Sequence, residues 1–502
     1  MKKYLKTGLF LFTLGLSVVS CESTLDVNES EVTATTDLVS PELLLAGALQ
    51  APRARYEVTT SELGSILMNQ WGGDINNVTG GFQDEYRLNF TQNYGVGSAI
   101  WRDLFRGMGT FQAIINNPNS AFNNYKAISM INKSYYFQVL TDLYGNIPYS
   151  QALQFGLNIS PAYDDSQSIY RDLIVQLDAA IAILENSSDY LPVGSEDTVF
   201  NGDANGWIQV ANTLKLRILL RQSELAGTDA ETATYLTEQF AALDTNFLTT
   251  NATLNPGYTA ADGQQNPFWN NYGTTAQGDP TFDNDFIVPS DYMVNFLRGV
   301  ATGQLDPRLV RMFEPVGDPA PGSYAPADIF GVVQGEVANP NELSELGPGL
   351  RFSAEQDSYF FTAAESFFLQ AEAVHKGYIT GNAQTLFHSG ITASFDLLGA
   401  TGAAAYIASS ENTNLIGWTG SSNKLEAIMT QKWIALCGIN AIESFIDYNR
   451  TGFPATPLSL IAEQARLPYR MLYPASEYST NSANVPNQPA SEAFTSKTFW
   501  NL

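Results

Sequence analysis

Helical periodicity recurs along most of this chain and constrains its fold more than any other feature. In residues 165–185, six apolar side chains recur at three- and four-residue steps and so share one helix face: Ile169, Leu173, Leu177, Ala180, Ile181 and Leu184. Asp164 or Asp165 offers an N-cap, and Gln167 lies where it would complete a capping box with Asp164. Similar patterns occupy residues 99–116, 125–143, 205–224, 358–376, 383–398 and 422–448. The sequence therefore predicts a mainly α framework.

Small residues lie among the aromatic residues of several of these helices. The segment 359–373, YFFTAAESFFLQAEA, is the clearest case. Large side chains that pack into small ones let helices approach closely, as in stacked antiparallel helix pairs of the tetratricopeptide kind. No clean repeat of about 34 residues is visible, so any such repeats are degenerate.

Three irregular regions interrupt the helical pattern. Residues 248–282 are rich in Asn, Gly, Thr and Gln with interspersed aromatics, residues 317–348 are rich in Pro and Gly, and a third region follows residue 451. Loops of this length in a compact helical protein are usually functional or form a secondary lobe.

The N-terminus carries a targeting signal that ends at Cys21. Lysines at positions 2, 3 and 6 precede an apolar stretch over residues 8–19, which is shorter than the ~20 residues that span a bilayer. Ser20 and the aliphatic residues before it precede Cys21 as in a bacterial lipoprotein. We expect a signal peptide over residues 1–20, lipidation of Cys21, a polar, flexible or extended tether over 21–36, and a single domain over 37–502.

Charge and cysteine content exclude some classes of partner. The 51 acidic and 25 basic residues give a net charge of −26, which repels nucleic acid and anionic lipid headgroups. Apart from Cys21 the only thiol is Cys437, so the mature chain has no intramolecular disulfide. Cys437 lies in an apolar run and is expected to be a buried structural thiol.

Catalytic motifs are scarce. The chain has two histidines, in no zinc-binding spacing, and it has no Gly-x-Ser-x-Gly elbow. Glycoside hydrolysis needs only two carboxylates, so a lipid-anchored glycan hydrolase stays open as an alternative. Asp74, Asp279, Asp283 and Asp285 lack the spacing of an EF-hand. We expect no metal and no cofactor.

Aromatic residues in polar loops are the candidates for ligand contact, because ligand sites combine aromatic surface with a few polar groups. They are Trp71, Trp418 and the cluster of Trp269, Asn270 and Tyr272. The competing interpretation is that each packs into the core. Trp101, Trp207 and Trp433 are expected to be structural. Arg217 and Arg221, one turn apart, either bind a ligand carboxylate or pair with acids on a helix surface.

Sequence blocks spread over nearly the whole chain carry a resemblance to a known family. They are DLYGNIPYSQA at 142–152, PAYD at 161–164, ANTLKLR at 211–217, DPR at 306–308, QKWIAL at 431–436, YNRTGFP at 448–454 and LPYRMLYP at 467–474. In their order and spacing the chain resembles the SusD/RagB-like nutrient-binding outer-membrane lipoproteins.

That resemblance implies a fold, a partner and a function. The fold is mainly α: a tetratricopeptide-like superhelix of helix pairs packed against a loop-rich lobe with minor short β-strands. The partner is a SusC-like TonB-dependent outer-membrane transporter, and the ligand is an oligomeric glycan or a peptide. Members sit in the outer membrane through their lipid, facing the cell exterior, and catalyse no reaction. A purely structural surface lipoprotein is the remaining alternative.

Replacing the lipid acceptor separates anchoring from binding. We expect the Cys21→Ser variant to bind ligand in solution as the wild type does, because the cysteine lies outside the predicted domain, while uptake by cells is impaired. Cell fractionation and ligand titration of the purified protein measure the two properties. Loss of affinity in solution would contradict a purely anchoring role for Cys21.

Overall fold

Helices make up most of the described chain, in agreement with the periodicity. The computed structural model describes residues 39–73, 81–317 and 325–501. The predicted signal peptide, Cys21 and the predicted tether lie outside these described residues. No described helix is long and apolar enough to cross a membrane.

The secondary structure is a series of helices interrupted by short strands. The first half contains helices α2 (Pro41–Arg55), α3 (Ser61–Leu67), α4 (Gln83–Arg87), α5 (Gly95–Asn116), α6 (Asn123–Tyr144), α7 (Ser166–Leu184), α8 (Ala204–Arg221) and α9 (Ala230–Ala242). The second half contains α10 (Pro267–Tyr272), α11 (Phe282–Phe286), α12 (Asp291–Arg298), α13 (Leu309–Met312), α14 (Ala363–His375), α15 (Ala383–Leu398), α16 (Ala403–Ser410), α17 (Lys424–Leu436), α18 (Ala441–Thr451), α19 (Ala475–Thr480) and α20 (Glu492–Thr495). The strands are β1 (Trp71–Gly73), β2 (Ile147–Pro148), β3 (Tyr163–Asp164), β4 (Ala252–Leu254), β5 (Ile287–Pro289) and β6 (Ser358–Phe361).

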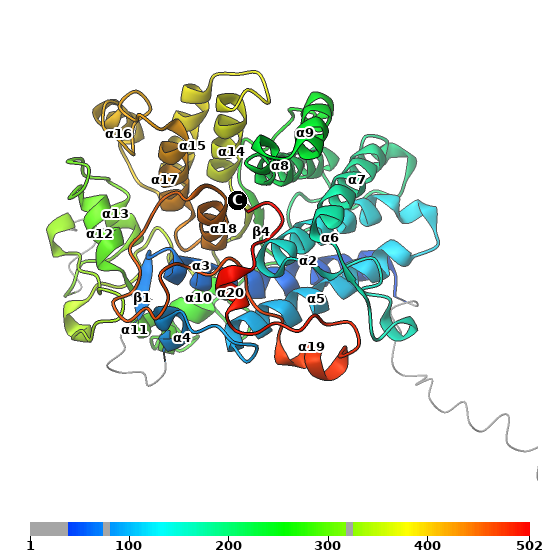
Figure 1. The fold of residues 1–502 in the computed structure, drawn as a ribbon, viewed down its shortest axis with the longest axis horizontal. Coiled ribbons are helices and arrows are strands. Elements are labelled where there is room, and N and C mark those ends of the chain that lie inside the picture. The colour runs from blue at the N-terminus through cyan, green and yellow to red at the C-terminus, as the bar shows by residue number, and fades with distance from the viewer. Residues whose placement is uncertain (1–38, 74–80, 318–324, 502) are drawn as a thin grey trace, which may run out of the picture.

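Successive long helices pack against each other. Helix α5 packs on α6, α6 on α7 and α7 on α8, and a second group joins α14 to α15 and α17. Figure 1 shows these helices in an arc, with the short elements β1, α4, α10 and α11 gathered at the lower left. The strands form two-stranded antiparallel pairs, β1 with β5, β2 with β3 and β4 with β6. The fold is thus the expected one of helix pairs against a loop-rich part with minor strands.

The start of α7 differs in detail from the prediction. Asp165 is the N-cap, because its side chain accepts a hydrogen bond from the Ser168 backbone N–H at 2.9 Å. The capping box with Asp164 is wrong. The Asp164 carboxylate instead accepts from the backbone N–H groups of Tyr149 and Ser150, each at 2.9 Å. It therefore ties β3 to the segment that follows β2.

Two predicted helices are divided in the structure. The aromatic residues at 358–361 form β6, which pairs with β4, and α14 begins only at Ala363. The pattern over 422–448 breaks after Leu436, where Gly438 adopts φ +70°. A Cβ on Gly438 would lie 2.6 Å from the Trp71 ring. The break thus lets the α17–α18 connection pack directly on β1.

A network of buried charges joins helices that are far apart in the sequence. It consists of Asp142 on α6, Arg217 and Arg221 on α8, Glu365 and Glu372 on α14, Lys432 on α17, and Glu443, Asp447 and Arg450 on α18, with side chains at most 4% exposed. Arg221 contacts Asp447 at 2.9 Å, Asp142 at 3.4 Å and also Glu443. Arg217 and Arg221 therefore pair with acids in the interior, and the predicted alternative of pairing on a helix surface is wrong.

The charges of the network shift one another's protonation. Burial alone would raise the pKa of Asp447, but Lys432 and Arg450 outweigh it and hold the pKa below its usual range. Burial raises the pKa of Asp142 to about 6, with Arg221 opposing it. Cys437 lies in the core beside this region, and burial raises the pKa of its thiol, as expected for a structural cysteine.

Removing one cation tests how far the fold depends on this network. We expect Arg221→Met to lower the free energy of unfolding by ~3–5 kcal/mol, because it removes a cation that contacts three carboxylates, Asp142, Glu443 and Asp447, which would stay buried. Denaturant unfolding followed by circular dichroism measures the change. Arg102→Met is the control, since Arg102 is exposed and, within the described part of the chain, forms an ion pair only with its neighbour Asp103. Equal unfolding midpoints for the two variants would contradict the account.

Candidate functional site

An aromatic groove of about 420 Å³ opens between α3, α4, the start of α5 and α11. Its lining residues define it from here on: Glu62, Gly81, Phe82, Asp84, Glu85, Tyr94, Gly95, Val96, Phe282, Asp283 and Phe286. These residues come from two parts of the chain about 190 residues apart, which the fold brings together. The groove combines phenyl rings with carboxyl groups.

Three phenyl rings form a row in the groove. The rings of Phe82 and Phe286 stack with centroids 5.2 Å apart and planes 24° apart, and those of Phe282 and Phe286 stack at 5.8 Å and 27°. Phe286 is buried, Phe82 is half-buried, and Phe282 is 66% exposed. The buried middle ring supports an outer ring that offers an apolar face to solvent.

The β1–β5 pair fixes the position of this row. Gly73 of β1 lies opposite Ile287 of β5, which directly follows Phe286. A Cβ on Gly73 would lie 2.5 Å from the Phe286 ring, and one on Gly81 would lie 2.4 Å from it. The two glycines therefore leave the space that the middle ring occupies.

The backbone conformation of Phe82, whose ring belongs to this row, is unusual. Its φ is +49°, in the left-handed region that residues with a Cβ rarely adopt. Such a conformation costs on the order of 1–3 kcal/mol and persists only when the surroundings impose it. The strain at Phe82 therefore coincides with the surface that presents the rings.

Side-chain hydrogen bonds tie α11 to α10. Thr281 is the N-cap of α11 and donates its hydroxyl to the Asn271 carbonyl at 2.6 Å. Asn284 donates its side-chain amide to the Tyr272 carbonyl at 2.9 Å. Asn271 in turn donates to the Asp283 carboxylate at 3.0 Å. The exposed ring of Phe282 is thus carried by an anchored turn.

Partly or fully buried carboxyl groups lie beside the rings, each with a neutral partner. The Tyr272 hydroxyl donates to Glu62 at 2.9 Å, and the Tyr94 hydroxyl donates to Glu85. Burial raises the pKa of Glu62 to about 8, and repulsion from Asp283 adds to the effect. Burial also raises the pKa of Asp283 and of Glu85.

The groove suits an uncharged ligand with hydroxyl groups. No lysine or arginine is among its lining residues, so it has no partner for an anion. Carboxyl groups accept hydrogen bonds from hydroxyls, and an exposed aromatic ring packs against an apolar ring face. An apolar surface with a few fixed polar groups is typical of small-molecule sites.

The structure places two predicted ligand residues in the core behind the groove. Trp71 is 0% exposed, and its ring contacts those of Phe268 and Tyr272. Tyr272 is also buried, and only its hydroxyl reaches the groove, through Glu62. In this structure neither ring offers a face to a ligand, and both pack in the core behind the groove.

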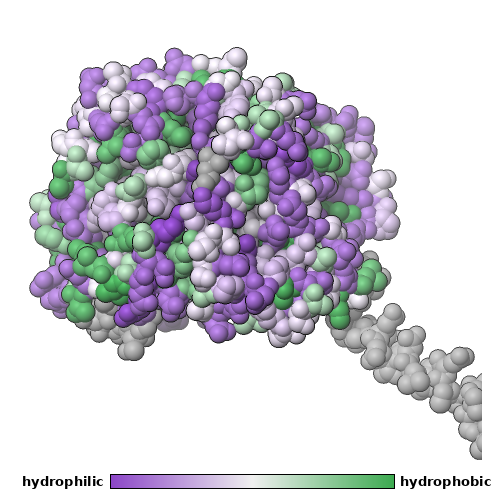
Figure 2. Space-filling view, viewed as in Figure 1, coloured by the Kyte–Doolittle hydropathy of each residue, from purple (hydrophilic) through white to green (hydrophobic). Residues whose placement is uncertain are grey.

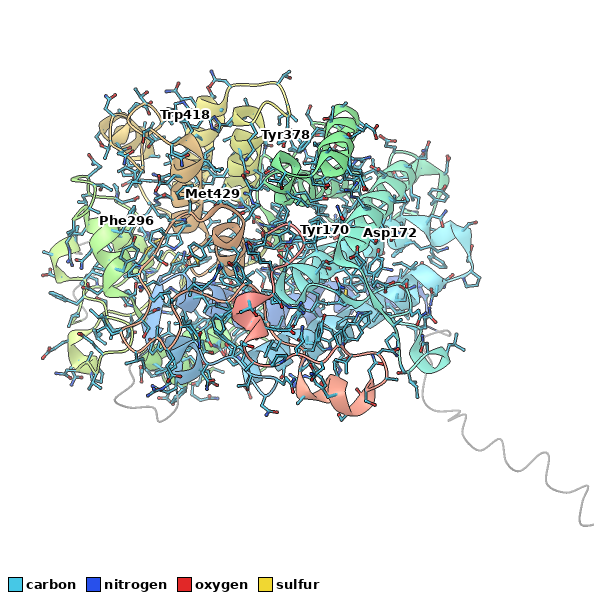
Figure 3. All side chains as sticks on the ribbon, in the orientation of Figure 1. Tyr170, Asp172, Phe296, Tyr378, Trp418 and Met429 are labelled. Carbon is cyan, nitrogen blue, oxygen red and sulfur yellow. The ribbon has the colours of Figure 1, made fainter. Side chains whose placement is uncertain are left out.

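The other predicted residues lie outside the groove. Trp269 is half-buried on α10 with its ring over Gly273, and Asn270 beside it is exposed. Trp418 is half-buried against Phe387 and Lys424. Figure 3 places Trp418 at the top of the molecule, far from α10 and α11. The structure therefore does not bring the predicted residues together in one site.

The groove residues that the sequence reasoning missed include three phenylalanines and two glutamates: Phe82, Phe282, Phe286, Glu62 and Glu85. Phe82 follows two glycines and Phe282 lies in the polar stretch PTFDND at 280–285, so both satisfy the rule of an aromatic residue in a polar loop. Neither was among the predicted residues, which centre on Trp71, Trp269 and Trp418. Figure 2 shows hydrophobic residues gathered at the lower left, over the region of β1, α4 and α11.

The described residues offer no cluster of three or more histidine, cysteine, aspartate or glutamate side chains that could hold a metal ion. Asp279 and Asp285 are exposed, and Asp283 bonds to Asn271. Asp74 lies outside the described residues.

Comparisons with known proteins agree with this fold. The SusD-like family, described as starch-binding and associating with the outer membrane, matches residues 39–474. A chitin-binding SusD homologue from Flavobacterium johnsoniae is 22% identical with a TM-score of 0.71, over 91% of this chain and 98% of its own. A second chitin-binding protein is 24% identical with a TM-score of 0.72, over 92% and 100%. A SusD homologue from Bacteroides uniformis is 23% identical with a TM-score of 0.69, over 91% and 99%. No curated protein matches.

The raised pKa of Glu62 predicts a pH dependence of stability. Between its ordinary pKa of 4.5 and about 8, the folded protein retains a proton on Glu62 that the unfolded chain releases, so stability falls as pH rises. The slope from one group is at most about 1.4 kcal/mol per pH unit. The Glu62→Gln variant has no titrating group at position 62, so it lacks this pH-dependent contribution to the free energy of unfolding. The free energy of unfolding of the wild type minus that of the variant should decrease from pH 5 to pH 8. A constant difference would contradict the prediction.

Proposed function

The chain belongs to the SusD-like family of starch-binding proteins that associate with the outer membrane, and on that basis we propose that it binds a neutral oligosaccharide in the aromatic groove. The observation that supports this most strongly is the row of three phenyl rings with Phe282 exposed at its outer end. The apolar face of a sugar ring packs on such a surface. The neighbouring carboxyl groups accept hydrogen bonds from sugar hydroxyls.

The proposed ligand is a neutral glycan. The family description refers to starch, and two structural neighbours are described as chitin-binding. Starch and chitin are both uncharged polymers of six-membered sugar rings. The absence of a lysine or arginine from the groove lining supports an uncharged ligand over one with carboxylates. A peptide is the alternative ligand class, and its carboxylate terminus would find no cation there.

Binding without hydrolysis fits the carboxyl groups of the groove better than catalysis does. A glycosidase needs one carboxyl as general acid and a second as nucleophile or base, both free to reach the scissile bond. Here Glu62 is held by Tyr272, Glu85 by Tyr94 and Asp283 by Asn271. We therefore assign the groove to capture of the glycan.

Lipid anchoring and handover complete the proposed function. Cys21 carries the lipid, residues 21–36 form the tether, and residues 37–502 form one binding domain at the cell exterior. A SusC-like TonB-dependent transporter receives the glycan from this domain. The targeting pattern before Cys21 and the family's association with the outer membrane support this arrangement.

Truncating the exposed ring tests the proposed site. We expect Phe282→Ala to weaken binding of chitohexaose or maltohexaose, whichever the wild type binds, by about tenfold or more, because aromatic contacts dominate such interfaces. Isothermal titration calorimetry measures the affinity.

Phe352→Ala is the matched control, since Phe352 is 53% exposed and does not line the groove. Equal affinities of the two variants would place the glycan elsewhere. Release of shorter sugars by the wild type during the titration would contradict a binding role without hydrolysis.

A further inference from the structure

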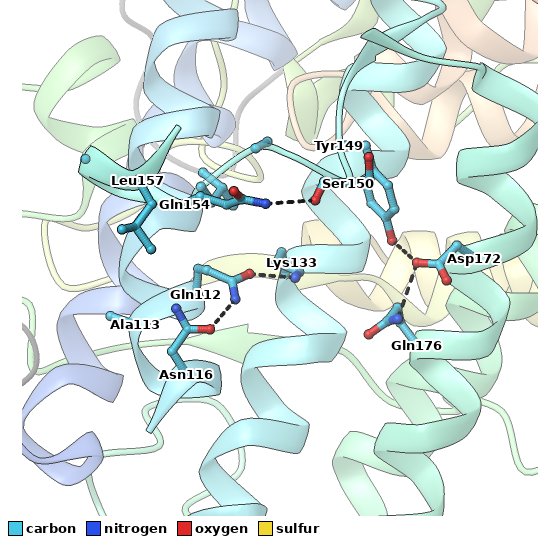
Figure 4. Close-up of a pocket in the computed structure, with 13 residues that line it drawn as sticks. Gln112, Ala113, Asn116, Lys133, Tyr149, Ser150, Gln154, Leu157, Asp172 and Gln176 are labelled. Atoms are coloured by element: carbon cyan, nitrogen blue, oxygen red, sulfur yellow. Dashed lines mark hydrogen bonds between the residues drawn. The ribbon is translucent and has the colours of Figure 1, made fainter. Parts of the chain in front are cut away.

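A second pocket, of about 680 Å³, lies between α5, α6, α7 and the segment 149–157. We name it the α5–α7 pocket, and its polar side chains are Gln112 and Asn116 on α5, Lys133 on α6, Asp172 and Gln176 on α7, and Tyr149, Ser150 and Gln154 (Figure 4). It shares no residue with the aromatic groove. In Figure 1 its helices lie at the right of the molecule, whereas α4 and α11 lie at the lower left.

Amide groups line one wall of this pocket in a chain of hydrogen bonds. Lys133 donates from Nζ to Gln112 Oε1 at 2.8 Å, and Gln112 donates from Nε2 to Asn116 Oδ1 at 2.7 Å. On the other wall the Tyr149 hydroxyl and Gln176 Nε2 both donate to Asp172 Oδ2. These bonds fix the polar groups in place before a ligand arrives, which lowers the entropy cost of binding.

Lys133 is the only cation in this lining, and a neutral amide oxygen is its hydrogen-bond partner. Among the described residues no carboxylate lies within the 4.0 Å of an ion pair with it. Burial lowers the pKa of Lys133, with the charge of Asp172 opposing the effect. A partly buried ammonium with no ion pair, on a protein with net charge −26, is an unusual feature that an anionic ligand would stabilise.

The rest of the lining suits a small ring with one apolar face. Ala113, Ala152 and Leu153 lie among the polar groups, and Leu157 at the mouth is 93% exposed. Hydroxyl groups of a ligand would find donors and acceptors in Asn116, Gln154 and Gln176.

We propose that the α5–α7 pocket is a second binding site, which takes a small carboxylate-bearing sugar with its carboxylate on Lys133 and its hydroxyls on the surrounding amides. The aromatic groove has no lysine or arginine among its described lining residues, so it offers no cation to the carboxylate of such a ligand. The two sites would therefore sort sugars by charge. This inference stands apart from the proposed function, because it uses a different cavity and a different ligand class.

Binding of glucuronate tests the second site. We expect the wild type to bind D-glucuronate at millimolar concentration, measured by ligand-observed NMR, and D-glucose at least tenfold more weakly. Lys133→Met should weaken glucuronate binding by tenfold or more, because it removes the charge and keeps the length of the side chain. Lys126→Met is the control, since Lys126 lies on the same helix outside the pocket. No binding by the wild type, or equal binding by the two variants, would overturn the proposal.

Removing the negative charge of Asp172 tests whether Lys133→Met acts through its charge and not through a loss of folding. Asp172→Asn removes the negative charge of the pocket and keeps an oxygen for the Tyr149 hydroxyl, so it should bind glucuronate several-fold more tightly than the wild type. Unchanged or weaker binding by this variant would overturn the role of charge. Phe282→Ala should bind glucuronate normally, and Lys133→Met should bind a neutral hexaose normally. These two results distinguish failure of the second site from failure of the aromatic groove.

Discussion

Buried ion pairs join α6 and α8, in the first half of the chain, to α14, α17 and α18 in the second half. Four cations and five carboxylates from α6, α8, α14, α17 and α18 meet in the interior, where each needs its partners because water cannot replace them. The network fixes α17 and α18 relative to each other. The connection between them at Gly438 packs on Trp71, and Trp71 begins the strand that carries Gly73 to the phenyl row. The aromatic groove is therefore assembled on a surface whose position is set by ion pairs in the core.

Helix α6 links the same network to the α5–α7 pocket. It carries Asp142 near its end, and Lys133 about two and a half turns earlier faces the pocket. The β2–β3 pair follows α6 directly, and Asp164 of β3 holds the backbone of Tyr149 and Ser150, which form part of the pocket wall. The groove and the pocket differ in charge. The groove has carboxyl groups beside an exposed phenyl ring, and the pocket has an ammonium and one carboxylate, that of Asp172, among amides.

Much of the fold could be predicted from the sequence, because helix periodicity is local. The pattern from Ile169 to Leu184 predicted α7 nearly to its ends. The run at 358–361 was misjudged, because its partner β4 lies about 100 residues earlier and pairing of that kind leaves no local pattern. The site could be predicted only in part. Trp71 and Tyr272, both predicted to contact ligand, are buried beside the aromatic groove, because burial decides which ring faces solvent and depends on contacts between distant segments. Phe82 and Phe282 were therefore missed.

The proposed function requires that a neutral glycan is held on the row of phenyl rings. A crystal structure of the protein grown with chitohexaose or maltohexaose, whichever it binds, tests this. We expect electron density for a sugar ring on the exposed face of Phe282, with hydroxyl groups within hydrogen-bond distance of the groove's carboxyl groups. Density for the oligosaccharide at another surface, with the aromatic groove empty, would contradict it.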